Sequence, residues 1–335
     1  MTHPAATAQP SRTQKETEMK AVIQDRYGSA EVLRVDEVDR PVPGEGQLLL
    51  RVKAAGLNYA DWHMMTGEPT IMRLGTGFSG PKQRIRGVDV AGVVEQVGPG
   101  VTEFAVGDEV FGSASGSFAE FALSAPTRLT RKPASVSFEQ AAAAPMAGYT
   151  ALQAVRGRVE AGTRVLVLGA GGGVGSFAVQ LAKHSGGHVT GVGSTGKVEL
   201  IRSLGADAVI DYTSAPVTGR FDLIVDTGGN RPLPVLRALL SPHGTLVIVG
   251  GEGGGRLFGP MGRVLHAAAL SPLVQQSLIG LFAAEQHNDL LELAALLESG
   301  AIAPAIDRVF PLEQAPDAMA HFAAARHAGK VVIVP

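Results

Sequence analysis

The sequence predicts an α/β fold in which a doubly wound parallel sheet is combined with a second, mainly β, barrel-like domain. From residue 164 onward, short β-branched runs alternate with helical patterns, the order typical of a parallel sheet with helices on both faces. Before residue 140, alternating apolar and polar residues are separated by turns such as Pro43-Gly44 and Gly107-Asp108, which indicates short antiparallel strands. The length of 335 residues supports two domains, because one hydrophobic core rarely serves so long a chain.

The first half begins with residues 1–18, which have no apolar periodicity and no apolar run of the kind found in signal peptides. We expect a loose tail there, and Met19 can be the natural start. Strands are then expected in MKAVIQDRYG from Met19, in the following VLRVDEV, and in residues 47–54, 90–97 and 118–123. An alanine-rich helix over residues 138–155 is expected at the joint between the two domains.

The second half carries five runs that are typical of buried parallel strands, because each is short, β-branched and bounded by turn residues. They are residues 165–168, 188–192, 208–210, 221–226 and 245–250. Val198, Ile201 and Leu204 share one face of a predicted helix, which Gly205 can end as a C-cap. The C-terminal region predicts one further strand, a helix and a final strand, in residues 307–312, 315–328 and 330–335.

Charge and cysteine content exclude several kinds of partner and site. With 29 Lys and Arg against 31 Asp and Glu, the formal net charge is −2, which does not favour a nucleic acid or an anionic membrane as main partner. The absence of cysteine excludes disulfides, iron–sulfur clusters, thiolate zinc ligands and cysteine nucleophiles. The uncharged runs 165–182 and 264–284 are not expected to span a membrane, because glycines interrupt the first, and Pro272 with polar residues the second.

The strongest local signal is GAGGGVG, Gly169 to Gly175, which lies between a predicted strand and the helical pattern SFAVQLAKH. A dinucleotide pyrophosphate needs a tight turn without side chains, free backbone N–H groups and the positive end of a helix dipole. The strict G-x-G-x-x-G spacing does not fit cleanly, and glycine-rich turns also arise for packing, so the strand–turn–helix context is what predicts a dinucleotide site. The residues expected to contact the cofactor here are Ala170, Gly172, Gly173, Val174 and Gly175.

The end of the second parallel strand predicts which nicotinamide cofactor binds. An Asp or Glu about twenty residues after the glycine turn would bind the ribose 2′-hydroxyl and repel a 2′-phosphate. The chain instead has Ser194, Thr195 and Lys197 there, whose hydroxyl and ammonium groups can bind a phosphate dianion. We therefore expect NADPH. In the alternative interpretation, Ser194 and Thr195 only cap the next helix and Lys197 is solvated.

The order of these features resembles the medium-chain dehydrogenase/reductase superfamily, and within it the zinc-independent quinone oxidoreductase branch. The resemblance extends from Met19 to the C-terminus and rests on MKAVIQDRYGSAEVL, AAGLNYADWHMMTGE, RGVDVAGVVEQVGPGVTEFAVGDEVFG, PMAGYTAL, the GGVG turn with VQLAK, SLGADAVIDY and GKVVIV. It implies a GroES-like catalytic domain of residues 19–140 and 286–335, a Rossmann NADP-binding domain of residues 141–285, and an active site in the cleft between them. It also implies a homodimer or homotetramer, often joined at the edge of the Rossmann sheet, and we expect a cytoplasmic protein.

The residues at the family's zinc-ligand positions do not favour a metal. In zinc alcohol dehydrogenases a C-x-x-D motif supplies a cysteine ligand, and the matching residues here run from Asn58 to Asp61. The histidine of the next motif, G-H-E, corresponds to Val88, and residues 112–116 stand where a four-cysteine lobe would follow. Tetrahedral zinc has therefore lost the ligands that the family's scheme requires, and we expect no metal site.

Without a metal, reduction of a conjugated acceptor is favoured over oxidation of a saturated alcohol. Alcohol oxidation leaves an alkoxide for a Lewis acid to stabilise, whereas hydride addition to an enone or a quinone spreads the charge by conjugation onto an oxygen. Hydrogen bonds and a proton donor can then be enough. The sequence therefore predicts NADPH-dependent reduction of a quinone or an α,β-unsaturated carbonyl.

The same resemblance suggests candidate catalytic residues. Asn58 can bind the nicotinamide ribose or the substrate oxygen, or be only a turn residue before a helix. Several relatives have a Tyr in place of His63, so His63 is the first candidate for proton donor or substrate anchor and Tyr59 the second. Water can also protonate the product enolate. Asp61 can position the segment that contains Asn58, Tyr59 and His63, or it can simply cap the helix there.

Further cofactor contacts are expected from four segments. Thr150 is expected at the nicotinamide side, with packing between the domains as the alternative. Tyr212 can pack on the adenine, and the Gly250-Gly251 turn can approach the carboxamide through its backbone. Lys330 can reach the cofactor ribose, unless it is only solvated.

The segment of residues 68–86 is expected to line the mouth of the substrate pocket. Its basic residues, Arg73, Lys82, Arg84 and Arg86, can attract an anionic or CoA-linked substrate, or be solvated on an exposed loop. Two other functions stay open at this point. One is an NAD(P)-dependent alcohol dehydrogenase or aldehyde reductase that works without zinc, and the other is an NADPH-binding protein without turnover.

Overall fold

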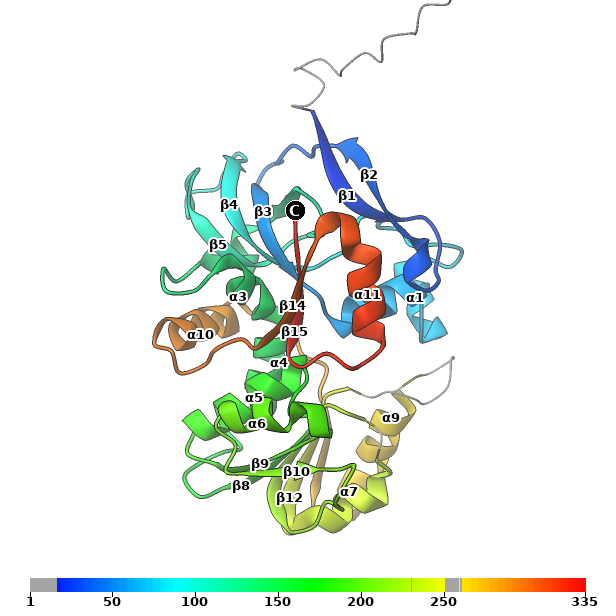
Figure 1. The fold of residues 1–335 in the computed structure, drawn as a ribbon, viewed down its shortest axis with the longest axis vertical. Coiled ribbons are helices and arrows are strands. Elements are labelled where there is room, and N and C mark those ends of the chain that lie inside the picture. Colours follow the sequence, from blue (N-terminus) through cyan, green and yellow to red (C-terminus); the bar gives the residue numbers. More distant parts are fainter. Residues whose placement is uncertain (1–16, 230, 251–258, 260) are drawn as a thin grey trace, which may run out of the picture.

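The computed structural model describes residues 17–229, 231–250, 259 and 261–335. These residues form two lobes, which we call the barrel lobe (strands β1–β7, β14 and β15) and the parallel lobe (strands β8–β13) (Figure 1). Residues 1–16 of the expected tail lie outside the described residues. The tail is shorter than expected at its other end, because Glu18 already begins the first strand.

The barrel lobe holds the mainly β part of the chain. Strands β1 (Glu18–Gln24) and β2 (Leu33–Asp39) pair antiparallel. The larger sheet has the order β14-β15-β3-β4-β5-β7, and β6 also pairs with β3. Its strands are β3 Leu48–Gly56, β4 Asp89–Val97, β5 Glu109–Ser113, β6 Phe121–Ser124, β7 Leu129–Arg131, β14 Ile306–Pro311 and β15 Lys330–Val334. The two C-terminal strands thus complete a sheet that begins near the N-terminus, and β15 lies against β3 (Figure 1).

The parallel lobe is a six-stranded, wholly parallel sheet with the order β10-β9-β8-β11-β12-β13. The strands are β8 Arg164–Leu168, β9 His188–Gly193, β10 Ala208–Asp211, β11 Phe221–Asp226, β12 Leu240–Ile248 and β13 Ser277–Gly280. Four of the five residues of β8 are fully buried, as its apolar run predicts for a central strand. The strand order reverses between β8 and β11, and ligands of such sheets bind at the crevice beside that reversal.

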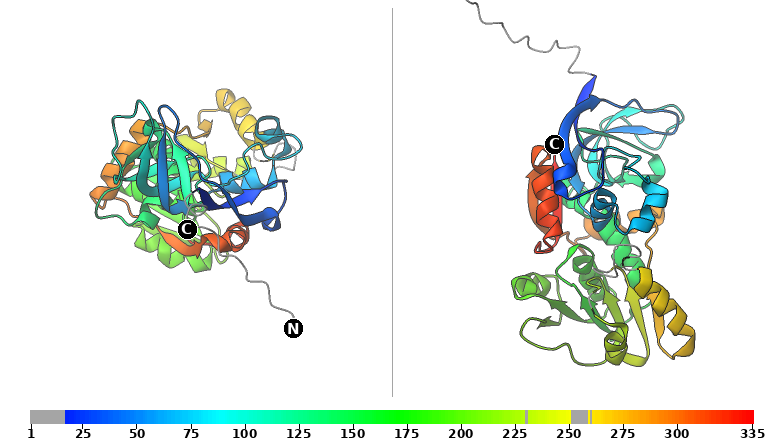
Figure 2. Two further views of the ribbon diagram at one scale, coloured as in Figure 1. Left: turned by 90° about the horizontal axis from the view of Figure 1, so that it is seen from above. Right: turned by 90° about the vertical axis from the view of Figure 1, so that its right-hand side faces the viewer.

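Helices cover both sheets and join the lobes (Figures 1 and 2). In the barrel lobe and at the junction they are α1 Tyr59–Thr66, α2 Arg73–Thr76, α3 Phe138–Ala143, α4 Pro145–Val155, α10 His287–Glu298 and α11 Ala315–Ala323. The parallel lobe has α5 Gly173–His184, α6 Val198–Ser203, α7 Leu233–Leu239 and α9 Met261–Leu270. Short 3-10 turns are η1 Ala30–Val32, η2 Thr70–Met72, η3 Pro126–Arg128, η4 Thr195–Lys197, η5 Ser271–Leu273 and η6 Leu312–Gln314.

Three predicted elements differ from the structure. The helix expected over 138–155 is two helices, because Pro145 has no N–H to continue α3 and instead begins α4. The strand expected over 118–123 is confined to β6, and the Phe118 N–H bonds to the Arg86 carbonyl instead. The helix expected over 315–328 ends at Ala323, and Ala325 has a left-handed φ of 54°.

One buried core extends across both lobes. It contains Ala54 and Phe111 of the barrel lobe, the alanines of α3 and α4, and Val167 and Val225 of the parallel lobe. The close packing of β3 on α3 requires a glycine, since a Cβ atom at Gly56 would lie 2.2 Å from the Ala142 carbonyl oxygen. This apolar contact fixes the two lobes against each other beside the crevice. Among the described residues, no helix is long and apolar enough to cross a membrane.

Candidate active site and cofactor cleft

The glycine turn between β8 and α5 has the geometry of a phosphate-binding turn. Gly169 has a φ of 76°, and α5 begins at Gly173 with Gly172 as its N-cap. A Cβ atom at Gly175 would lie 2.1 Å from the Gly169 carbonyl oxygen, so only glycine permits this contact between strand and helix. The first N–H groups of α5, from Gly173, Val174 and Gly175, have no partner within the helix and can bind an anion.

The structure gives Ala170 a different position from the other residues of the glycine turn that were expected to contact the cofactor. The Ala170 N–H donates to the Val192 carbonyl over 3.0 Å, and the side chain is fully buried. The tight turn is therefore made by Gly169, which has the positive φ, and not by Ala170. Ala170 supports the turn by packing against β9, while the open side of the turn belongs to Gly172 and the residues after it.

The barrel lobe meets this turn through the residues that begin β15. The Gly329 N–H donates to the Gly171 carbonyl over 2.9 Å. The stem of Lys330 passes beside Gly173, where a Cβ atom would lie 3.1 Å from Lys330 Cδ. Lys330 is 2 % exposed, so the interpretation of this lysine as merely solvated is wrong.

Lys330, Asn58 and Asp89 form a buried polar cluster at the start of α1. The Lys330 ammonium donates to Asn58 Oδ1 and lies 3.7 Å from Asp89 Oδ2. Asn58 Nδ2 donates to Asp89 Oδ2 over 2.9 Å, and the Met146 N–H at the start of α4 donates to the same carboxylate over 3.2 Å. Both ends of the Asn58 amide are thus held by charged groups, which fixes its orientation.

Asn58 also begins α1 as its N-cap, which is the turn role considered for it. The Asn58 N–H donates to Asp61 Oδ2 over 2.9 Å, and the two side chains form a capping box. Burial raises the pKa of Asp61 to about 7 and that of Asp89 to about 6, while Lys330 opposes both shifts. Burial likewise lowers the pKa of Lys330, against the attraction of Asp89 and Asp61. The cluster therefore holds titratable groups whose charges depend on one another.

Helix α1 carries the two candidate proton donors on one face. Tyr59 is 42 % exposed, and its ring packs edge-on against Phe322 of α11 with centroids 5.0 Å apart. His63 follows one turn later, with its ring centroid 6.2 Å from that of Tyr59. Beside them, Trp62 and Met65 border a groove that Tyr27 and α11 close on the other side. The α1 segment therefore joins the polar cluster to a space with aromatic walls.

The hydrogen bond of His63 fixes its tautomer. Its Nδ1 lies 2.5 Å from the Glu68 carbonyl oxygen, which can only accept, so Nδ1 carries the proton. Burial lowers the pKa of His63 from its ordinary value, so the neutral ring prevails at pH 7. The Nε2 atom of this tautomer is an acceptor. His63 is thus suited to receive a hydrogen bond from substrate or water, whereas the Tyr59 hydroxyl can donate one.

The end of β9 brings together the residues expected to distinguish NADPH from NADH. Neither Ser194 nor Thr195 donates or accepts a helix-capping hydrogen bond through its side chain, and Lys197 Nζ donates to the Ala325 carbonyl over 3.4 Å. The Thr195 hydroxyl donates to Asp211 Oδ2 over 2.6 Å. Hydrogen bonds from Thr195 and Thr213 lower the pKa of Asp211, so a carboxylate adjoins this site. Ser194 and Lys197 are left as the groups best able to bind a phosphate.

The other predicted contacts lie around the same crevice. The Thr150 hydroxyl donates to the Met146 carbonyl over 2.6 Å within α4, which leaves its oxygen lone pairs to accept. Tyr212 follows β10, is 54 % exposed and has its N–H on the Gly193 carbonyl. Gly250 follows β12, where the Val249 N–H bonds to the Asp226 carbonyl. Gly251 lies outside the described residues.

The expectation for residues 68–86 is wrong in part. Arg86 is 3 % exposed, so it is a core residue and not part of an exposed pocket mouth. Arg84 is paired with Asp25, with 2.7 Å between Nε and Oδ1. Arg73 Nε donates to the Gly67 carbonyl over 3.0 Å and its guanidinium lies over the Tyr27 ring. The expectation is therefore wrong for the buried Arg86, whereas Glu68 and Arg73 do line the groove beside α1.

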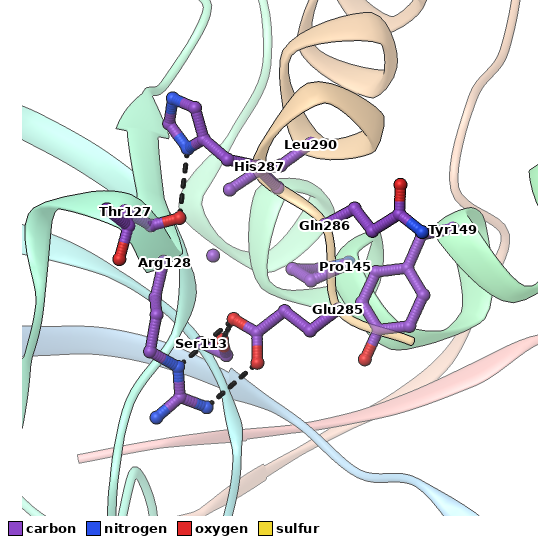
Figure 3. A pocket seen from close by; sticks show the side chains of 10 residues that line it. Ser113, Thr127, Arg128, Pro145, Tyr149, Glu285, Gln286, His287 and Leu290 are labelled. Carbon is purple, nitrogen blue, oxygen red and sulfur yellow. Dashed lines mark hydrogen bonds and ion pairs between the residues drawn. The ribbon is translucent and has the colours of Figure 1, made fainter. Parts of the chain in front are cut away.

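A small hollow lies where the chain returns from the parallel lobe to α10 (Figure 3). Glu285 accepts hydrogen bonds from Arg128 at 3.1 and 3.0 Å and another from the Ser113 hydroxyl. Tyr149 lines the same hollow, and burial together with Asp89 and Glu285 raises its pKa, so the phenol stays neutral. The ion pair fastens the connection between the lobes, and none of the residues predicted to bind cofactor lines this hollow.

The residues around Asn58 do not fit a zinc ion. The matching ligand positions hold an asparagine and, in Val88, an aliphatic side chain, and the sequence has no cysteine. The carboxylate that is present, Asp89, already has the Lys330 ammonium and the Asn58 amide as partners. Within the described ranges, no group of three or more His, Asp or Glu side chains is placed to hold a metal ion.

Two carboxylates of the site escaped sequence reasoning. Asp89 follows Val88 and precedes the expected strand 90–97; in the structure it is the first residue of β4 and fully buried, which is typical of a paired charge. Asp211 ends the third parallel strand, and only the β9–β10 pairing places it opposite Gly193. The spacing after the glycine turn leads only to the end of the second strand, so it gives no signal for a carboxylate that comes from the neighbouring strand.

Comparisons with known proteins agree with this geometry. Residues 44–134 match the alcohol dehydrogenase GroES-like domain, and residues 204–333 match a family described as zinc-binding dehydrogenase. A 2-methylene-furan-3-one reductase of Solanum lycopersicum is 34 % identical over 95 % of this chain and 80 % of its own. An NADPH-dependent alkenal/one oxidoreductase of Arabidopsis thaliana is 33 % identical over the same shares.

A solved structure extends the likeness to the whole fold. The quinone oxidoreductase from Coxiella burnetii is 28 % identical, covers 95 % of this chain and 99 % of its own, and superposes with a TM-score of 0.83. Its likeness and that of the curated relatives extend over both lobes, as the resemblance from Met19 to the C-terminus implied. The chain belongs to the medium-chain dehydrogenase/reductase superfamily, in its zinc-independent quinone oxidoreductase-like branch.

Proposed function

We propose that this protein is a zinc-independent, NADPH-dependent oxidoreductase that reduces a quinone or an α,β-unsaturated carbonyl by hydride transfer. The observation that carries the proposal is the buried Lys330–Asn58–Asp89 cluster beside the glycine turn, in the place where the family's zinc enzymes have metal ligands. A conjugated acceptor suits such a site, because its developing charge needs hydrogen bonds more than a Lewis acid. The names of the relatives, which include quinone and alkenal/one oxidoreductases, support the same substrate class.

Bound NADPH would supply the hydride, and the chain would supply position, polarity and a proton. Hydride transfer to the β-carbon would leave NADP⁺ and move the C=C electron pair toward the carbonyl, so the carbonyl oxygen would gain the negative charge that the chain must stabilise. In this proposal the Tyr59 hydroxyl would donate a hydrogen bond to that oxygen, and the neutral His63, one turn away on α1, would accept one from a hydroxyl or a water. A proton from Tyr59 or from water would complete the reduction. If Tyr59 is the donor, solvent would then reprotonate it.

The cofactor would lie along the crevice from β10 to α1. The N–H groups of Gly173, Val174 and Gly175 would hold the pyrophosphate, and Lys330 the nicotinamide ribose. Ser194 and Lys197 would bind the 2′-phosphate, and Tyr212 would pack on the adenine. The same proposal assigns Asn58, Thr150, Gly172, Thr195 and Gly250 to the surrounding wall of the cofactor site, while the buried Ala170 supports the turn from behind.

Three expectations about the whole molecule remain proposals. The division into a catalytic domain of residues 19–140 and 286–335 and an NADP-binding domain of residues 141–285 is retained. Assembly as a homodimer or homotetramer and a cytoplasmic location are retained as well. Size-exclusion chromatography with light scattering tests the assembly, and fractionation of the producing cells tests the location.

A steady-state screen of NADPH oxidation tests the function. Quinones, enones, enoyl thioesters and aldehydes are offered in turn, with and without a chelator. We expect turnover of a quinone or an enone that the chelator leaves unchanged. Turnover of aldehydes alone would indicate an alcohol dehydrogenase or aldehyde reductase, and NADPH binding without oxidation of any acceptor would indicate a non-catalytic protein. Loss of turnover on removal of stoichiometric zinc would contradict the zinc-independent mechanism.

A further inference from the structure

Helix α2 and the loop that follows it carry two strongly exposed apolar side chains. Leu74 on α2 is 75 % exposed, and Phe78 in the following loop is 79 % exposed. We call residues 76–82 the α2 loop. A single exposed apolar side chain is ordinary on a protein surface, whereas neighbouring ones indicate contact with a partner or an apolar phase. These two side chains therefore mark the α2 loop as a candidate interaction surface.

The backbone of the α2 loop is held in place, so the exposure of Phe78 belongs to a defined conformation. The Lys82 N–H donates to the Thr76 carbonyl over 2.9 Å, which closes the loop. The Tyr27 hydroxyl donates to the Gly77 carbonyl over 2.8 Å and anchors the loop to the barrel lobe. Gly77 has a φ of 122°, and a Cβ atom there would lie 2.0 Å from a carbonyl oxygen of the same loop. The fold therefore presents Phe78 from a turn that requires glycine.

Exposed cations gather beside the α2 loop. The chain that leaves the loop runs antiparallel to the end of β1, where the Gln24 N–H donates to the Arg84 carbonyl over 2.9 Å. The loop itself approaches the residue after β1, since a Cβ atom at Gly80 would lie 3.0 Å from the Asp25 carbonyl oxygen. Four exposed cations come from these segments and from β2, and we call them the basic patch: Arg26, Arg34, Lys82 and Arg84.

The basic patch has more positive charge than its carboxylates can neutralise. Asp25 accepts hydrogen bonds from both Arg84 and Arg34, over 2.7 and 2.6 Å, and these bonds lower its pKa. A second carboxylate, Asp36, lies 3.6 Å from Arg34. For the other two cations of the patch, the described part of the chain provides no carboxylate partner. The net charge of −2 therefore describes the whole chain, whereas this face is locally positive.

We propose that the α2 loop and the basic patch form a docking surface for an anionic lipid membrane, with Leu74 and Phe78 inserted below the lipid phosphates and the cations at their level. A membrane surface presents anionic headgroups above an apolar layer, so it complements both features at once. A protein partner is less suitable, because two side chains beside a short loop offer little of the roughly 800 Å² that a stable protein interface buries on each partner. The inference goes beyond the proposed function and does not depend on it.

Co-sedimentation of the full chain with lipid vesicles tests the docking surface. One set of vesicles contains phosphatidylglycerol and phosphatidylcholine in equal parts, and the other contains phosphatidylcholine alone. We expect the protein to bind the anionic vesicles more tightly. Salt at about 1 M should remove most of that difference, because the Debye length then falls to about 3 Å.

Two variants separate the apolar from the electrostatic contribution. Phe78→Ser combined with Leu74→Ser should weaken binding to the anionic vesicles about tenfold, because it removes the apolar surface that enters the lipid. Lys82→Gln should weaken the same binding about fivefold, the usual contribution of one basic residue near an anionic surface. It should leave binding to phosphatidylcholine alone unchanged, since that surface carries no net charge.

The matched controls lie on other segments of the barrel lobe. Val42→Ser combined with Val106→Ser removes two apolar side chains that are 80 % and 66 % exposed. Lys53→Gln removes an exposed lysine from β3. Each control should change vesicle binding far less than its counterpart at the docking surface. Thermal unfolding of every variant establishes that it is folded.

The proposal is overturned if the unmodified protein does not bind the anionic vesicles, or if the double variant at Leu74 and Phe78 binds them as tightly as its valine control. Light scattering distinguishes a protein contact. If that double variant changes the oligomeric state, and vesicle binding is absent, the surface joins copies of this chain and the membrane assignment is wrong. Because the vesicle experiment uses neither cofactor nor acceptor, its failure leaves the proposed function standing.

Discussion

The side-chain ammonium of Lys330 donates a hydrogen bond to the side-chain oxygen of Asn58, across 272 positions of sequence and in a buried setting. This contact fastens the last strand of the barrel lobe to the first turn of α1. Asp89 completes the arrangement, because its carboxylate faces the ammonium and accepts from the Asn58 amide. The geometry at the start of α1 thus depends on one buried charge pair.

Replacing Lys330 by Met should destabilise the protein more than replacing both members of that pair. Lys330→Met leaves the Asp89 carboxylate buried without its cation, a change that costs up to about 3–5 kcal/mol of unfolding free energy. In the double variant with Asp89→Asn, no uncompensated charge remains, and the introduced amide oxygen can still accept from Asn58. Urea unfolding of the two single variants and the double variant at pH 8 measures the coupling. Additive losses would show that the two side chains are energetically independent.

The two raised carboxyl pKa values make stability depend on pH in a defined direction. Asp61 and Asp89 bind protons more tightly in the folded state than at their unfolded value of 3.8. Each therefore contributes most stability below about pH 4 and loses it as pH rises through the folded values of about 7 and 6, by up to about 1.4 kcal/mol per pH unit. The stabilisation that these two protonated carboxyl groups contribute should be lost completely above about pH 7.

Asp61→Asn tests this dependence with little change of shape, because an asparagine oxygen can still accept from the Asn58 N–H. We expect its unfolding free energy to exceed that of the unmodified protein at pH 8, and the difference to shrink at pH 5. Urea unfolding followed by Trp62 fluorescence at both values gives the comparison. An equal difference at both pH values would mean that Asp61 keeps its charge throughout this range.

Local patterns were enough to predict the parallel sheet but not the polar cluster. The run from Val165 to Leu168 identifies a buried strand because burial on both faces leaves only β-branched and aliphatic residues. The left-handed turn at Ala325 has no sequence signal, because alanine favours helices and the helical pattern of α11 continues through this residue. Lys330 and Asp89 lie on strands far apart in sequence, so their pairing follows from the sheet topology and not from any local spacing.

Removing the charge of Asp211 should increase the preference for NADPH. This carboxylate accepts from Thr195 at the end of β9 and stays ionised, so it opposes a phosphate dianion nearby. Asp211→Asn keeps an acceptor for the Thr195 hydroxyl, and the ratio of kcat/KM for NADPH over NADH should rise several-fold. Glu199→Gln, which removes an exposed carboxylate that pairs with Arg202 on α6, is the control and should change the ratio less. A fall in the ratio for Asp211→Asn would assign that carboxylate to the cofactor instead.

Relieving the left-handed conformation of Ala325, just after α11, should stabilise the fold. Ala325→Gly removes a conformational strain of about 1–2 kcal/mol and adds the chain entropy cost of a glycine, about 0.4–1 kcal/mol. We expect a net gain of about 0 to 1.6 kcal/mol, measured by thermal and urea unfolding. Ala323→Gly, at the last residue of α11, is the matched control and should lower stability, since glycine is unfavourable in a helix. Destabilisation by both substitutions to the same degree would contradict the strain at Ala325.

The last test separates the two aromatic candidates on α1. Because His63 donates through Nδ1 to the Glu68 carbonyl and is neutral at pH 7, it lacks a proton to give, whereas Tyr59 carries one at every pH below its ionisation. Tyr59→Phe should therefore lower kcat about 10²-fold, the usual contribution of a general acid, with KM for NADPH unchanged. His63→Phe should act mainly on KM for the acceptor. A kcat that rises steeply below pH 6 in the unmodified protein, and loses that rise in His63→Phe, would identify the imidazolium as the donor and reverse the order.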